Sequence, residues 1–428
     1  MANELTYKDV IKDPQYMKLL FSNLINRFGD SIDAIAFTWL VYKITNSASW
    51  AALIFGLNLL PNILVQPFVG PIVERMNKKM VIVFTHLIRG CVILAFAFMY
   101  MKGAVNPYIM MGFTLVITTI ESFNLPASRA VIPLIVSKDK LAHAMSLNSS
   151  LSSAVSLVGT SLAGFIIARL GVQIAMFIDI ATFFIAAVAM ILVKTSEEAE
   201  DADVSEQQAH KEESYISSLK QGIAYVYHNR VILNVCAVAI ILNFFTTPIG
   251  ALQAPMATEV YKLGSELLSV IGIAGSIGGI LGAIITPKIM SRFSVKTVLV
   301  FGGLLLGGFT YLLSLGGMFG GAVIPGYLWA AMCIIVLNGA AGIMTGVINI
   351  QFERTCDLNY LARAGAVLGA ASMVATPVGS FIVSAASVYV GPGFLIGVFG
   401  LMSIVSMVIV LFSKADFEIE KREATNES

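Results

Sequence analysis

Apolar stretches of about 20 residues recur along the whole chain and are separated by short polar stretches. A helix rises about 1.5 Å per residue, so about 20 apolar residues are needed to cross the hydrocarbon core of a bilayer. A helix also satisfies its own backbone hydrogen bonds in lipid. The pattern therefore predicts an all-α membrane protein with twelve transmembrane helices, at residues 17–42, 48–72, 79–101, 106–128, 142–168, 172–193, 231–258, 266–290, 295–316, 326–350, 362–388 and 392–413.

The composition agrees with this pattern. Hydrophobic residues make up 57% of the chain and charged residues 12%, about half the usual charged share of a soluble domain. The net charge of +1 gives no indication of nucleic-acid binding. The four cysteines are scattered, without a CxxC pair or a histidine at metal-ligand spacing, so we expect neither a disulfide framework nor a metal site.

The distribution of lysine and arginine predicts the orientation. If the N-terminus is cytoplasmic, the even-numbered connections and both tails hold 21 of the 27 basic residues. The opposite side then holds four, which are Lys43, Lys102, Arg169 and Lys262. Because cytoplasmic loops are enriched in Lys and Arg, we expect a multi-pass protein of the cell (inner or plasma) membrane with both termini in the cytoplasm.

The longest polar interval divides the spans six and six. Residues 196–214 contain eight acidic residues against one lysine, and residues 215–230 have the spacing of an amphipathic helix on the membrane surface. We therefore expect a six-helix bundle in 1–193, an acidic cytoplasmic linker with an amphipathic helix in 194–230, a second six-helix bundle in 231–413 and a cytoplasmic tail in 414–428.

The two halves resemble each other. At an offset of 220 residues, LAHAMSLNSSLSSAVSLVG (141–159) aligns without gaps to LARAGAVLGAASMVATPVG (361–379), with identities that begin at Leu141 and Leu361 and end at Gly159 and Gly379. A duplication of six helices is typical of transporters that bind substrate between two repeats. We expect two pseudo-symmetric bundles.

The connection after the second span, GPIVERMNKKM (70–80), resembles the loop signature of the major facilitator superfamily, G-x-x-x-D-R-x-G-R/K-R/K. Longer stretches, among them NLPASRAVIPLIVSKDKLAHAMSLNSSL (124–151), are similar to the drug:proton antiporters that include macrolide-efflux proteins. The resemblance implies the major facilitator fold and alternating access. It also implies a conformational switch made of charged residues at the cytoplasmic helix ends, for which the candidates are Gly70, Glu74, Arg75, Lys78, Lys79, Arg129 and Arg363.

Charged residues inside predicted spans are the candidates for function, because a charge at bilayer depth is costly unless it is paired, hydrated or neutralised. Asp30 and Asp33 share a face of the first span with Asn23, Asn26 and Phe37, and Arg27 borders that face. The fourth span adds Glu121. In the superfamily that the chain resembles, the first and fourth helices of each half line the central cavity. We interpret Asp30, Asp33 and Glu121 as proton-coupling residues; the candidate substrate-binding residues are Asn26, Arg27, Phe37, Asn243, Gln253 and Asn338.

Structural roles are the alternative. Asp30 or Asp33 could pair with Arg27 and hold helices in register. Asp179, and Arg89 with His86, lie on helices that the resembling family places at the periphery, where we favour structural pairing.

The sequence thus predicts a secondary transporter that exports a lipophilic or amphipathic small molecule in exchange for protons. Its expected partners are that substrate, protons and the lipid bilayer, and we expect a monomer without a cofactor. There is no G-x-x-x-x-G-K-[ST] phosphate-binding loop to suggest hydrolysis. Movement of a lipid, siderophore or metabolite, with or without proton coupling, is the main alternative. The chain could also be a non-transporting receptor, but its short loops leave little surface for a partner. It could be a membrane enzyme that uses the three acids, but the sequence has no nucleophile beside them.

Overall fold

The computed structural model describes residues 10–74, 76–137, 139–194, 215–357, 360–413 and 415–417, and the side chains of residues 66, 67, 71, 74, 215–219 and 362 are outside the description. The acidic part of the linker and most of the C-terminal tail therefore lie outside the described residues, as do the side chains of Glu74 and Arg75. Contacts divide the chain into two units. The first comprises Met1–Glu212 with Leu263–Ile273, and the second comprises Glu213–Lys262 with Ala274–Ser428.

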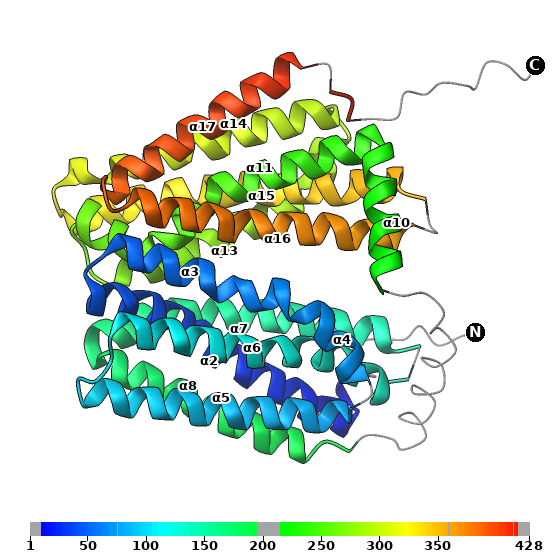
Figure 1. Cartoon of the computed structure of the whole chain (residues 1–428), viewed down its shortest axis with the longest axis vertical. Helices are drawn as coiled ribbons and strands as arrows, with labels where there is room; N and C mark the ends of the chain where they lie inside the picture. Colours follow the sequence, from blue (N-terminus) through cyan, green and yellow to red (C-terminus); the bar gives the residue numbers. More distant parts are fainter. Residues whose placement is uncertain are drawn as a thin grey trace, which may run out of the picture. The chain divides into compact units, whose positions relative to one another are not determined.

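The first unit is a bundle of helices, and its contact partners can be followed in Figure 1. Its elements are α2 (Pro14–Thr45), α3 (Ala48–Leu64), α4 (Gln66–Glu74), α5 (Lys78–Met101), α6 (Pro107–Val131), the 3-10 turn η1 (Ile132–Leu134), α7 (Leu141–Leu170) and α8 (Val172–Ile191). The most extensive packing joins α8 to α2 and to α5, and α2 also packs against α7. These helices hold the polar groups described below.

The second unit is also all-helical. Its elements are α10 (Tyr215–His228), α11 (Arg230–Ala251), α12 (Gln253–Pro255), the π-helix η2 (Met256–Val260), α14 (Val295–Ser314), the 3-10 turn η3 (Leu315–Phe319), α15 (Val323–Thr355), α16 (Leu361–Ala386) and α17 (Pro392–Phe412). Helix α13 (Glu266–Met290) begins in the first unit and continues into the second from Ala274.

Local sequence explains where many helices begin. Asp13 precedes α2, which begins at Pro14, and its carboxylate accepts hydrogen bonds from the amides of Gln15 and Tyr16 in the first turn. Asn77 caps α5 in the same way, through the amide of Met80. Side-chain oxygens at this position satisfy amides that the helix itself leaves unpaired.

The all-α prediction is confirmed, and all twelve predicted spans contain helix, but two of them are interrupted. The second span breaks at Val65, between α3 and α4, because Pro67 has no amide hydrogen and belongs in a first turn. The seventh span ends as α11 at Ala251 and continues as α12 and η2, where Pro255 has the same effect. By length and apolarity, ten described helices qualify as membrane-spanning; α3, with 17 residues, and α2, with its charged residues, do not.

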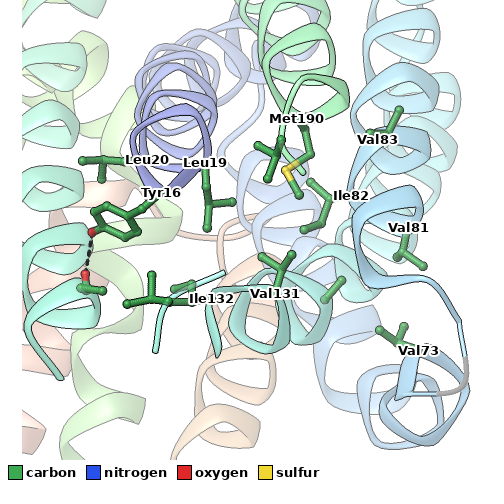
Figure 2. Packing of buried hydrophobic residues seen from close by; sticks show 14 of the residues in the cluster. Tyr16, Leu19, Leu20, Val73, Val81, Ile82, Val83, Val131, Ile132 and Met190 are labelled. Carbon is green, nitrogen blue, oxygen red and sulfur yellow. Dashed lines mark hydrogen bonds between the residues drawn. The ribbon is translucent and has the colours of Figure 1, made fainter. Parts of the chain in front are cut away.

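A cluster of buried apolar residues in the first unit lies where several of its helices begin or end (Figure 2). Tyr16 and Leu19 of α2 pack there with Ile82 of α5 and Met190 of α8, and the Tyr16 hydroxyl donates to the Ala144 carbonyl of α7 over 2.7 Å. This cluster fixes the ends of four helices and so sets the rotation at which their polar faces meet deeper in the bundle.

Candidate functional site

A polar cavity of about 360 Å³ lies within the first unit. Helix α2 contributes one wall, with residues spaced three or four positions apart, and α5, α6 and α7 contribute the other walls. The polar and charged lining residues are Asn23, Asn26, Arg27, Asp30, His86, Arg89, Glu121, Asn124, Ser128, Arg129, Asn148, Ser149 and Ser152.

Asp30 is the centre of this lining. One carboxylate oxygen, Oδ1, lies 2.9 Å from Nη2 of Arg89 on α5, and the other, Oδ2, accepts a hydrogen bond of 2.8 Å from Nδ2 of Asn26. The Asp30 side chain is 20% exposed and that of Arg89 is 6% exposed. The guanidinium also lies over the ring of Phe183 on α8, 4.4 Å from its centroid. The ion pair thus ties α2 to α5 and to α8, and its Asp30 side is the more exposed of the two.

This arrangement corrects two interpretations of the sequence. Among the described residues the ionic partner of Asp30 is Arg89, and Arg27 forms no ion pair. Arg89 and His86 are not peripheral, because both line the cavity. Distance along one helix identifies neighbours on that helix, whereas the partner from α5 depends on how two helices are rotated against each other.

The other predicted residues of the first unit divide into two groups. Glu121 and Arg27 line the cavity with Asp30 and Asn26, and Arg27 and Arg89 both act electrostatically on Glu121. Asp33 is partly buried beyond the cavity lining, within the electrostatic reach of Arg89.

Phe37 also lies outside the cavity. Its ring is 6.2 Å from that of Phe96 on α5, centroid to centroid. The polar face of α2 therefore opens to the cavity only as far as Asp30.

The second unit has its own cavity, of about 430 Å³. Its polar lining residues are Asn243, Thr246, Thr345, Asn349 and Ser372. None of the residues that the structure describes around this cavity is ionisable. Two predicted binding residues lie elsewhere: Asn338 donates to the Ile334 carbonyl of its own helix, and Gln253 begins α12.

The predicted switch residues lie in different surroundings. Gly70 is in α4 with open space around it. Lys78 is buried, and Nζ of Lys79 donates to the Val193 carbonyl over 2.6 Å. Arg129 lines the cavity of the first unit.

Arg363 belongs to the second unit, where it donates to Oε1 of Gln221 on α10. The same contact region stacks the ring of Tyr225 on that of Tyr360, with the centroids 4.5 Å apart. Arg363 thus joins α10 to the start of α16.

The sequence interpretation undervalued three buried groups, Arg89, His86 and Asp179. Each is an ionisable residue in the interior of a predicted span, and that alone was a usable signal. Asp179 has no exposed surface. The assumption that its helix is peripheral hid its position beside α2.

These observations define a multi-pass membrane protein with polar cavities inside bundles of apolar helices, which is the architecture of a transporter. The sequence profile of the Major Facilitator Superfamily matches residues 19–364, and the chain belongs to this family.

Curated relatives agree with this assignment. The chain is 22% identical to the uncharacterized MFS-type transporter YvqJ of Bacillus subtilis, over 96% of this chain and 95% of that protein. It is 21% identical to macrolide efflux protein A of Streptococcus pyogenes (78% and 80%) and 22% identical to the multidrug efflux pump Tap of Mycolicibacterium fortuitum (84% and 86%).

Solved structures show the same fold. The chain superposes on the nucleoside transporter NupG with a TM-score of 0.74 at 12% identity, covering 94% of this chain and all of that one. A bacterial homologue of the iron transporter ferroportin gives a TM-score of 0.66 at 15% identity, covering 93% and 99%. The chain is therefore a transporter of the Major Facilitator Superfamily.

Proposed function

We propose that the chain exports a lipophilic or amphipathic small molecule, such as a macrolide or a lipophilic cation, in exchange for protons. The observation that supports this most is the cavity of the first unit, which Asp30 and Glu121 line together with Arg89. A carboxylate between burial, which favours its neutral form, and a neighbouring cation, which favours its charged form, can take up and release a proton as its surroundings change. The efflux activities named for two of the relatives agree with this direction of transport.

Asp30, Asp33 and Glu121 are the proposed proton-coupling residues. The proposed substrate contacts are the cavity-lining residues Asn26, Arg27 and Asn243. The other three candidates, Phe37, Gln253 and Asn338, line neither cavity, so they could contact a substrate only in a different conformation of the protein. Alternating access is the proposed mode of transport. The protein would act as a monomer in the plasma membrane with both termini in the cytoplasm, as the distribution of Lys and Arg predicts.

The test uses the purified protein in liposomes that contain a pH-sensitive dye. A macrolide, a lipophilic cation and a fluorescent phospholipid are added in turn, with and without an imposed pH gradient. We expect the macrolide or the cation to drive proton movement, and we expect Asp30→Asn or Glu121→Gln to abolish it. Glu353→Gln, which changes an exposed acid outside both cavities, is the matched control.

Two results would contradict the proposal. Transport of the macrolide or cation without proton movement would make the protein a facilitator. Movement of the phospholipid alone would make it a lipid transporter of the same fold.

A further inference from the structure

Asp179 is a fully buried carboxyl group without a hydrogen-bond partner. It lies on α8, its exposed fraction is 0%, and among the described residues neither Oδ1 nor Oδ2 accepts or donates a hydrogen bond. The nearest hydroxyl on its own helix, that of Thr182, donates to the Asp179 backbone carbonyl instead, over 2.7 Å. An ionised carboxylate in this position would lack every contact that normally compensates for burial.

The carboxyl group points at the backbone of α2 beside Asp30. A Cβ atom added to Gly29 would lie 2.7 Å from Oδ1 of Asp179, so this close approach depends on a residue without a side chain. Asp30 is the next residue along α2. One carboxyl that faces the cavity and one that is sealed from it therefore lie on either side of the same helix–helix contact.

Arg89 is the cation shared by this group of residues. Its Nη2 pairs with Asp30 while its Nε is buried without a partner. It stacks on Phe183, which is one helical turn after Asp179. The guanidinium is thus held against α8 and has an unused donor there.

The ionisable groups near Asp179 come from two of the helices packed against α8. Helix α2 supplies Asp30 and Asp33, and α5 supplies Arg89. The ring of His86, also on α5, lies 6.0 Å from that of Phe183, centroid to centroid. Helix α7 carries ionisable groups only near its two ends, and neither of them acts on Asp179. Arg89 is already paired with Asp30, so an ionised Asp179 would have no cation of its own.

We propose that Asp179 stores a proton which it exchanges with Asp30, and that Arg89 moves in the opposite direction. In the conformation described, Asp179 is a neutral acid and Asp30 is a carboxylate paired with Arg89. When the proton passes to Asp30, the Asp30–Arg89 pair opens and Arg89 pairs with the new Asp179 carboxylate. The number of protons and the total charge are unchanged, and the proton now lies on the acid that is open to cavity water. This inference rests on the proposed proton coupling and adds an internal step to it.

The test is infrared spectroscopy of the full chain in lipid bilayers, with neither substrate nor pH gradient. A protonated carboxyl group absorbs apart from a carboxylate, so the wild-type spectrum minus that of Asp179→Asn isolates Asp179. We expect this difference to show a protonated group at neutral pH. Asp139→Asn, which changes an exposed acid of the same unit, should leave the band in place.

The decisive comparison repeats the subtraction in an Asp30→Asn background. Arg89 then has no partner on α2, so it should pair with Asp179, and the difference should show a carboxylate instead. A protonated Asp179 band that survives Asp30→Asn would overturn the proposal, and so would a carboxylate band for Asp179 in the wild type. If Asp179→Asn does not fold, aspartate labelled with ¹³C in its carboxyl group tests the same exchange through the total signal of protonated aspartate. We expect that signal to be smaller in Asp30→Asn than in the wild type, and an unchanged signal would overturn the proposal.

The result is independent of the liposome assay. Absence of substrate-driven proton movement would refute the proposed function without changing these spectra. Loss of the predicted spectral exchange would refute the proton store while leaving proton-coupled transport possible through Asp30 alone.

Discussion

Replacing Arg89 with Gln should destabilise the first unit more than any other single change in the cavity. The lost ion pair has an N–O distance of 2.9 Å, which corresponds to about 1.4 kcal/mol at the dielectric constant of water and about 5.7 kcal/mol at an effective value of about 20. Asp30 is 20% exposed and can be hydrated or protonated once it is alone, so we expect a loss of about 2–3 kcal/mol from the pair. The contact with Phe183, 4.4 Å from its ring centroid, adds about 1–2 kcal/mol.

The measurement is the apparent melting temperature of the purified protein. A total of about 4 kcal/mol corresponds to roughly 8–16 °C for a bundle of this size. Asp30→Asn should lower the melting temperature less, because Arg89 can then pair with Asp179. Arg89→Lys, which keeps the charge and loses the stacked planar group, should fall in between. A melting temperature for Arg89→Gln within about 2 °C of the wild type would refute the reasoning, since that is about the shift expected from one exposed contact.

Three further predictions concern helix contacts. Gly29→Val should reduce the yield of folded protein in size-exclusion chromatography, because its Cβ would overlap with Oγ1 of Thr182. Gly282→Val should do the same in the second unit, where a Cβ would overlap with the Gly339 carbonyl oxygen. Gly112→Val, with open space around it, should fold normally. Burial raises the pKa of the Tyr225 hydroxyl. The contribution of neutral Tyr225 to stability is therefore fully present below about pH 10, the usual tyrosine pKa, and is lost as the pH rises above it. The tyrosinate absorbance of the wild type minus that of Tyr225→Phe should show one group that titrates above about pH 10.

The fold was largely predictable because the bilayer imposes one length and one type of structure on each span. The predicted boundaries at residues 79–101 and α5 (Lys78–Met101) differ by one residue. The breaks at Val65 and Ala251 were missed because hydropathy averages over a window and does not register a missing amide hydrogen. The prolines that cause these breaks are visible in the sequence, so local chemistry held information that the periodicity did not.

The site was predictable along a helix and not between helices. Asn23, Asn26 and Asp30 line the cavity as their spacing predicted, because that relation depends only on 3.6 residues per turn. The Asp30–Arg89 pair joins residues 59 positions apart. Its existence depends on the depth and rotation of α5 relative to α2, which are set by the packing of both helices against α8.

The distribution of charge between the units narrows where proton coupling can occur. In the described helices of the second unit that are long and apolar enough to span a membrane, the Asp, Glu, Lys and Arg residues stand within the first or last turn, as Lys296, Glu353 and Arg363 do. The first unit, in contrast, holds Asp30 and Asp179 in helix interiors. A proton carried at bilayer depth therefore has its acceptors in the first unit. In the cavity of the second unit, the groups that a substrate could contact are side-chain amides and hydroxyls, which do not titrate. We therefore expect substitutions in this cavity to change which substrate is moved and to leave the pH dependence of transport unaltered.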